Sequence, residues 1–312
     1  MSSNIVNPVD KKLERSIMQL HRFLRNYYNG PESVTGLIDA LITASNKLTK
    51  ATWNHYRSAF IYAYQQTKYP EVSQQFKKLS YEVARQKLGL TNKPVKQQHC
   101  KKVSEVDHQK IVEALQYFNK EHSALAAVII IARETGVRPS EIPSMKFSSE
   151  FLSISITGAK KTEDGSRGLD RAQLFEKDLF DKIKTAHAIW SDYKHALPDH
   201  STGQAMKLLQ NQFAELTKKI WPRRKRRITL KSYRHQFGSN LKASGRERIE
   251  IAAIMGHQSV DSVTAYGNAR SSTRAPVIRV SHSSLAGVRK IEQKPCRPEQ
   301  KRKADNQLGV LP

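Results

Sequence analysis

The stretch LKSYRHQFGSNLKASGRERIEIAAIMGHQSVDSVTAY (230–266) decides the fold of the second half of this chain. Its apolar residues recur at helical spacing, which predicts one helix over 229–243 and a second over 247–256. Gly256 allows the second helix to stop, and this stop places His257 at a turn. The stretch therefore predicts two helices that bring polar side chains to their ends.

Four polar side chains of this stretch belong to types that bind or attack phosphate. Lys231 and Arg234 lie three residues apart, so they share one face of a helix. Tyr266 follows His257 by nine residues, on a short helix expected to begin at Ser262. Taken singly, two cations on a helix usually form a solvated face, and a lone His or Tyr is usually structural.

A further arginine stands in TGVRPSEI (135–142). It follows the stretch 123–135, which is apolar nearly all round and predicts a buried helix. Gly136 ends that helix, and Arg138 comes directly after it at the turn. Glu141 lies three residues on, where it is placed to orient Arg138 or to pair with its charge. Alone, this pattern is more typical of a surface arginine at a helix start.

A period-two pattern interrupts the helices. Residues 151–157 alternate apolar and polar side chains, which predicts a strand with one solvated face. A charged, turn-rich segment follows, and 172–175 is expected to be the returning strand. This hairpin places Lys160 and Lys161 at its tip. The fold is therefore expected to be mainly helical with a small antiparallel β-sheet (α+β).

The composition points to a polyanionic partner. Among 312 residues, 53 Lys and Arg stand against 28 Asp and Glu, a net charge of +25. A surface this basic attracts nucleic acid; a ribosome, an anionic membrane or mere solubility are the other readings. Cys100 and Cys296 lack CxxC spacing, which disfavours a disulfide framework or a cysteine-based zinc site. The polar residues 1–10 and the short apolar run 124–132 predict a soluble, cytoplasmic, nucleoid-associated protein.

Residues 1–90 read as a separate helical domain. Thr49 is expected to cap its third helix, which Pro70 ends, and a fourth helix is expected over 71–88. Residues 91–103 read as a basic linker, either a solvated hinge or a strap across a DNA backbone. Its lysines are Lys93, Lys96, Lys101 and Lys102.

Two further basic segments stand out. After about residue 268 helical periodicity is lost, so 271–312 is expected to be a basic tail, mostly disordered unless bound. The sharpest run of charge is RRKRR (223–227), which reads as a nuclear-import signal or, preferably, as a loop facing DNA. Its members are Arg223, Arg224, Lys225, Arg226 and Arg227.

The order of these motifs resembles the tyrosine recombinase, or phage integrase, family. The matching stretches are TGVRPSEI (135–142), LKSYRHQFGSNL (230–241) and MGHQSVDSVTAY (255–266), with a hairpin lysine between the first two. The resemblance implies a catalytic domain over 104–270. Residues 1–90 are similar to the family's helical, SAM-like core-binding domain only weakly, around LTKATWNHYRSAF (48–60).

The resemblance implies a role for each matching side chain. Tyr266 attacks the scissile phosphate, forms a 3′-phosphotyrosyl bond and frees a 5′-hydroxyl. Arg138 and Arg234 hold the phosphate oxygens, because a guanidinium binds two oxygens at once and stays charged at any working pH.

The remaining matches are supporting donors. His257 donates to the phosphate, and so does Lys231, which stands where the family often has histidine. A hairpin lysine protonates the leaving 5′-oxygen; Lys161 is preferred and Lys160 is the alternative. Glu141 supports the arginine cluster.

The resemblance also implies the partners. The covalent bond conserves the cleaved linkage, so neither a metal nor ATP is implied. Double-stranded DNA is the substrate, and a homo-tetramer on two paired sites exchanges strands through a Holliday junction. A type IB topoisomerase, which uses similar chemistry, and an inactive DNA-binding protein on the same fold are the alternatives.

Overall fold

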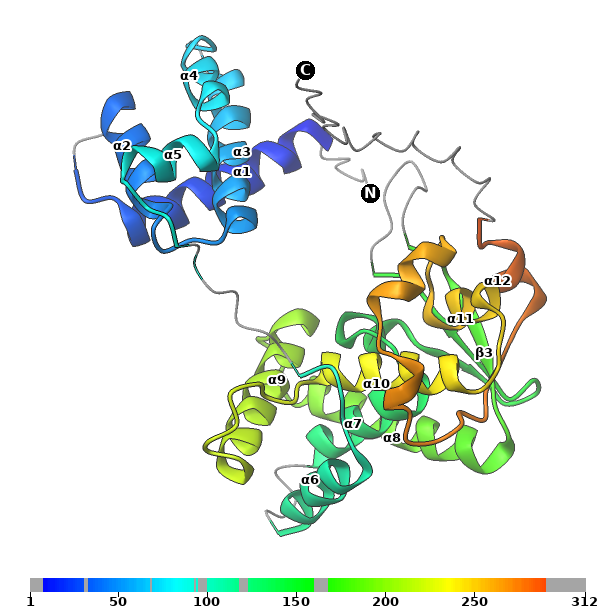
Figure 1. Cartoon of the computed structure of the whole chain (residues 1–312). Coiled ribbons are helices and arrows are strands. Elements are labelled where there is room, and N and C mark those ends of the chain that lie inside the picture. The colour runs from blue at the N-terminus through cyan, green and yellow to red at the C-terminus, as the bar shows by residue number, and fades with distance from the viewer. Residues whose placement is uncertain are drawn as a thin grey trace, which may run out of the picture. The chain divides into compact units, whose positions relative to one another are not determined.

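The chain forms two compact units, Met1–Gln97 and Gln98–Pro312. In the computed structural model the first is a cluster of helices and the second combines helices with a small sheet (Figure 1). No helix in the described part of the chain is both long and apolar enough to cross a bilayer. The structure describes residues 8–30, 33–67, 69–92, 94, 100–117, 123–159 and 168–289.

The first unit packs its helices around aromatic side chains. Phe23 and Trp53 are fully buried there. The indole N–H of Trp53 donates a hydrogen bond to the Leu41 carbonyl at 2.7 Å, so the ring is buried without leaving its polar atom unpaired. The described helices of this unit are α1 (Pro8–Tyr27), α2 (Val34–Ala44), α3 (Lys50–Gln65), α4 (Val72–Lys78) and α5 (Tyr81–Lys87).

Capping residues set where these helices begin. Thr49 caps α3 as predicted, because its hydroxyl accepts a hydrogen bond from the N–H of Thr52. The single helix expected over 71–88 is wrong, because the chain forms α4 and α5 instead. Ser80 has an extended backbone, and its hydroxyl accepts from the N–H of Val83 at 3.1 Å. This local hydrogen bond starts a new helix where periodicity alone suggested continuity.

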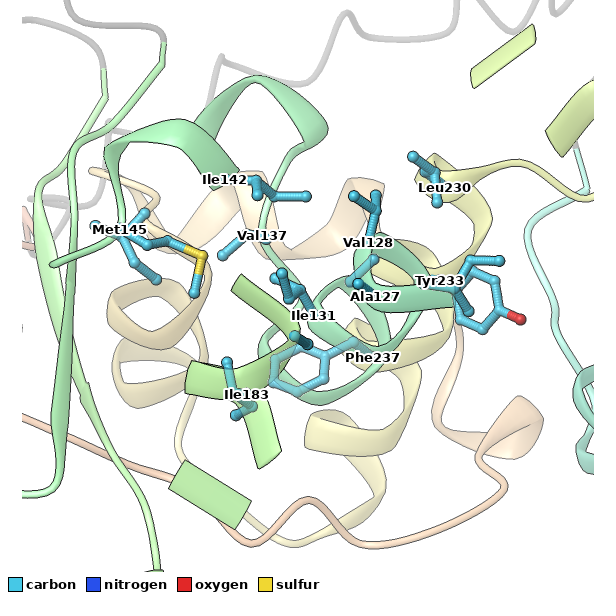
Figure 2. Packing of buried hydrophobic residues seen from close by; sticks show 14 of the residues in the cluster. Ala127, Val128, Ile131, Val137, Ile142, Met145, Ile183, Leu230, Tyr233 and Phe237 are labelled. Carbon is cyan, nitrogen blue, oxygen red and sulfur yellow. The ribbon is translucent and has the colours of Figure 1, made fainter. Parts of the chain in front are cut away.

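The second unit has the buried helix α7 (Ser123–Thr135) in its core, as the sequence predicts. Ala127 and Val128 of α7 lie near Tyr233 and Phe237 of α10 (Figure 2). The other described helices are α6 (Glu105–Tyr117), α8 (Lys177–His195), α9 (Thr202–Ile220), α10 (Leu230–Ala243), α11 (Arg248–Met255) and α12 (His282–Ala286), with short 3₁₀ helices η2 (Pro139–Ser144), η3 (Val260–Ala265) and η4 (Ala269–Ser271).

A four-stranded antiparallel sheet completes the second unit, in the order β1–β2–β3–β4. The two expected strands form as β2 and β3, with Ser153 opposite Leu174 and Ile156 opposite Arg171. The mainly helical α+β fold is thereby confirmed. The strands are β1 (Lys146–Ser148), β2 (Ser153–Ile156), β3 (Arg171–Leu174) and β4 (Arg279–Val280).

The expectation of a disordered tail is wrong for residues 271–289. Val280 of β4 pairs with Gln173 of β3, which satisfies backbone groups on the outer edge of that strand. Arg274 forms an ion pair with Glu134 at 2.7 Å. The segment is held by partners more than 100 residues earlier in the chain, which local composition does not reveal.

Candidate active site

Arg234 lies near the start of α10 and is almost fully buried. Its guanidinium donates to the carbonyls of Gly136, at 2.6 Å, and Met255. It also donates to Nε2 of His257 at 2.9 Å. Burial, followed by the charges of Arg138 and Arg171, lowers the pKa of Arg234 to about 10. The group therefore stays charged at neutral pH and is held from several sides.

Arg138 is placed by the tight turn after α7. Gly136 has φ of +63°, and a Cβ there would lie 2.2 Å from the Phe237 ring, so only glycine fits this turn. Arg138 then precedes η2, where its guanidinium contacts Glu141 Oε1. Its backbone N–H donates to Glu141 Oε2 at 3.0 Å. The carboxylate thus fixes both the main chain and the side chain of Arg138.

Glu141 is fully buried among three arginines. Arg171 Nη2 lies 2.8 Å from its Oε2, and Arg234 Nη1 lies 3.9 Å from the same oxygen. Burial raises the pKa of Glu141, but Arg171, Arg234 and Arg138 together lower it by more, to about 2. The carboxylate is therefore charged at every working pH.

His257 occupies the turn after α11, as the sequence predicts. Gly256 ends the helix in the left-handed conformation, with φ of +66°, and the His257 N–H donates to the Ala252 carbonyl at 2.8 Å. Burial, followed by the charge of Arg234, lowers the pKa of His257 to about 3. The ring is therefore neutral at pH 7. Because Nε2 accepts from Arg234, the proton of the neutral ring sits on Nδ1.

Tyr266 comes directly after η3 and is half-buried. Its ring makes an edge contact with the His257 ring at 4.8 Å between centroids, and the Arg234 guanidinium carbon lies 5.0 Å from its centre. Burial raises the pKa of Tyr266, but the charges and hydrogen bonds of Arg234 and Arg138 lower it by more. A larger fraction of this hydroxyl is therefore ionised at a given pH than in a free tyrosine.

The main chain at Tyr266 is anchored to α10. Lys242 donates to the carbonyl of Tyr266 and, at 2.9 Å, to that of Gly267. Gly267 has φ of +46°, and a Cβ there would lie 1.9 Å from Ser239 Oγ and 2.6 Å from the His235 carbonyl oxygen. Only glycine permits this close approach.

A cavity of about 540 Å³ opens over these side chains. Arg138, Arg234 and Tyr266 line it, together with the exposed Lys231 of α10 and Lys207 of α9. The cavity therefore gathers four cations around one tyrosine, which suits an anionic oxygen-rich group such as a phosphodiester.

The family follows from a direct comparison. Residues 101–272 match the sequence model of the phage integrase family, which is more than half of the chain. The chain belongs to the phage integrase family. Members are tyrosine-type site-specific recombinases, and this chain is one of them. A search among curated proteins finds no match.

Solved structures share the fold of this chain at low sequence identity. A lambda integrase tetramer bound to a Holliday junction matches with a TM-score of 0.52 and 14% identity, covering 86% of this chain and 74% of that one. A lambda integrase dimer bound to a COC′ core site matches with a TM-score of 0.51 and 14% identity, covering 85% of this chain and 73% of that one. The Tn1549 transposon integrase in complex with transposon right end DNA matches with a TM-score of 0.50 and 15% identity, covering 84% of this chain and 90% of that one. These likenesses concern the fold alone.

The structure brings five of the predicted site residues together, with Lys231 at the cavity wall. They are Arg138, Glu141, Arg234, His257 and Tyr266. Four other expected lysines, Lys160 and Lys161 of the hairpin and Lys93 and Lys96 of the linker, lie outside the described residues.

The basic residues expected to contact DNA differ in what they bind. Arg224 holds Asp107 of α6 with both guanidinium nitrogens, at 2.8 and 3.2 Å, and lies over the Trp221 ring. This arginine therefore braces the loop before α10. Arg227 is half-buried. The exposed members of the set are Lys101, Lys102, Arg223, Lys225 and Arg226.

Sequence reasoning missed two residues of this site. Lys242 carries no motif, and only its contact with the Tyr266 carbonyl reveals it. Arg171 opens the strand β3 and is buried there, although the sequence places it at the edge of a charged segment. One signal was present: Arg171 and Gln173 alternate along β3 on its buried face, where apolar residues are usual.

Proposed function

We propose that Tyr266 is the nucleophile of this recombinase. Its hydroxyl oxygen attacks the scissile phosphorus, a 3′-phosphotyrosyl bond forms, and the bond to the 5′-oxygen breaks. The observation that carries this proposal is the position of Tyr266 in one cavity with Arg138 and Arg234, whose positive charges lower the pKa of its hydroxyl.

The proposed roles of the cations follow from charge development in the transition state. The non-bridging phosphate oxygens gain negative charge as Tyr266 attacks, and Arg138 and Arg234 bind them as preorganised donors. His257 and Lys231 supply further hydrogen bonds. Lys161, or alternatively Lys160, protonates the leaving 5′-oxygen, so that a neutral hydroxyl departs.

The proposed substrate is double-stranded DNA carrying a specific site. The net charge of +25 and the exposed Lys101, Lys102, Arg223, Lys225 and Arg226 support phosphate contacts along the duplex. A 5′-hydroxyl from the partner duplex then attacks the phosphotyrosine and restores a phosphodiester, which needs no outside energy source. Exchange through a Holliday junction requires four active sites, so the proposed assembly is a homo-tetramer on two paired DNA sites. Its proposed location is the cytoplasm, in association with the nucleoid.

The test is covalent trapping. Nicked duplexes drawn from DNA flanking the chain's own gene are incubated with the protein, and adducts that survive denaturation are mapped. Wild type is expected to form an adduct at one sequence, and Tyr266→Phe to form none while still binding that DNA. An adduct with Tyr266→Phe would remove Tyr266 as the nucleophile.

Tyr233→Phe is the matched control. Tyr233 is also a tyrosine of the second unit, but it is buried and its hydroxyl hydrogen-bonds to His108 Nδ1 at 3.0 Å. It should keep the ability to form the adduct. A two-site recombination assay beside a supercoil-relaxation assay separates strand exchange from topoisomerase activity; relaxation without recombination would contradict the proposal.

A further inference from the structure

Arg171 stands apart from the side chains discussed for cleavage, because its side chain is completely shielded from solvent. It projects from the first residue of β3, opposite Ile156 of β2. One of its nitrogens, Nη2, donates to Glu141 Oε2 at 2.8 Å. Two others, Nε and Nη1, have no hydrogen-bond partner among the described residues. A buried guanidinium with a single carboxylate partner carries a large desolvation cost.

Arg171 also lies against the turn that carries His257. A Cβ added at Gly256 would come within 2.5 Å of Arg171 Nη1 and 3.1 Å of its Cζ. The Arg171 guanidinium therefore occupies the space that a side chain at position 256 would need. Arg171 thus touches two walls of the site, the Glu141 carboxylate and the residue before His257.

The guanidinium groups of Arg138 and Arg171 bind different oxygens of Glu141. Oε1 contacts Arg138, while Oε2 is bonded to Arg171 and stands 3.9 Å from Arg234. With Arg171 in place, Oε2 is already satisfied and does not draw Arg234 away from the Gly136 carbonyl and from His257. The charge balance also matters, because three arginines against one carboxylate leave the cluster positive.

We propose that Arg171 is a positioning residue, which holds Glu141 so that Arg138 and Arg234 keep the orientation needed to bind the scissile phosphate. It acts through Glu141 and does not reach the DNA, because its side chain is fully buried. This inference rests on the proposed cleavage by Tyr266.

The charged and titratable groups around Glu141 determine the expected pH response. Removing Arg171 takes away the strongest of the three charges that hold the pKa of Glu141 low. Glu141 of the variant should therefore take up a proton at a higher pH than in wild type. The charged and titratable groups that face Glu141, among the described residues, come from several elements. They are Arg138 directly before η2, Asp170 and Arg171 at the start of β3, Arg234 on α10, His257 after α11 and Tyr266 after η3.

The experiment measures single-turnover adduct formation on the trapping duplex from pH 5 to 9, at saturating DNA. Arg171→Met is expected to slow adduct formation about 100-fold, the usual effect of a small misplacement of catalytic groups. DNA affinity should change less than about threefold, since Arg171 makes no DNA contact. The loss should deepen as pH falls, and Arg171→Lys, which keeps the charge, should recover part of the rate.

Two comparisons separate positioning from loss of fold. Gln173→Met removes another buried polar side chain from the same face of β3. The Nε2 of Gln173 donates to the carbonyls of Thr135 and Ile254 and not to Glu141. It should lower the unfolding temperature without a pH-dependent loss of rate. In a Glu141→Gln background, Arg171→Met should add little further loss, because both changes act on one interaction.

The inference is overturned if Arg171→Met behaves like Gln173→Met at every pH, if its defect lies in DNA affinity, or if the two losses multiply in the double variant. Wild-type protein that forms no adduct at Tyr266 would instead contradict the proposed function. The two failures are therefore distinguishable.

Discussion

The ammonium group of Lys242 donates a hydrogen bond to the main-chain carbonyl of Tyr266, from a distance of 24 residues along the chain. The same nitrogen holds the carbonyl of Gly267 at 2.9 Å. A single side chain of α10 therefore binds the carbonyl groups of two consecutive residues, Tyr266 and Gly267. This contact helps to hold the Tyr266 ring against the Arg234 guanidinium, because the tyrosine itself follows a short 3₁₀ helix and not a long element.

Lys242→Met should slow adduct formation roughly tenfold, the effect of losing about 1.4 kcal/mol of hydrogen bonding. The defect should lie in the rate at saturating DNA and not in DNA affinity. Lys177→Met, which removes an exposed lysine paired with Asp181 on α8, is the control and should leave the rate unchanged. Equal rates for the two variants would show that Lys242 does not position the nucleophile.

Gly267→Ala should impair cleavage far more than Gly245→Ala. Both glycines have positive φ, +46° and +73°, so both substitutions strain the backbone. A Cβ at Gly267 meets Ser239 Oγ at 1.9 Å, whereas one at Gly245 meets nothing within 4 Å. Thermal unfolding should show about 1 kcal/mol of destabilisation for Gly245→Ala, because a residue with a Cβ disfavours the left-handed conformation. Adduct formation is measured on the same two variants. Gly267→Ala should in addition lose most of its cleavage rate.

Stability should fall in acid because of Glu141. Its pKa drops from an ordinary 4.5 to about 2 in the folded protein, so its contribution is complete above pH 4.5 and is lost as pH falls toward 2. The contribution is on the order of 3 kcal/mol. Urea unfolding at several pH values should show a shallower acid slope for Glu141→Gln than for wild type. Glu215→Gln, at an exposed position, should keep the wild-type slope.

The RRKRR loop should contribute to DNA binding unevenly. Arg226 is exposed, whereas Arg224 forms an ion pair with Asp107. Arg226→Gln should reduce the slope of log affinity against log salt by about 0.9, the value for one phosphate contact. Arg224→Gln should leave that slope nearly unchanged and lower the unfolding temperature. A reversed result would place Arg224 at the DNA and Arg226 away from it.

The sequence by itself determined the family and the main helices of the second unit. Apolar periodicity marked α7 and α10, and glycines marked the turns before Arg138 and His257. These signals are local, since helix spacing, caps and left-handed turns depend on residues within about one or two helical turns. The ordered motifs added the family, which the comparison with the phage integrase family then confirmed.

The tertiary structure alone decided which charges are buried and what they bind. Arg171 became part of the site through Glu141, 30 residues earlier, and Arg224 is bound by Asp107, 117 residues earlier. The segment 271–289 gained its order from β3 and Glu134, which lie far back in the chain. In each case the favourable energy comes from pairing across distant segments, and composition around a single residue carries no record of that pairing.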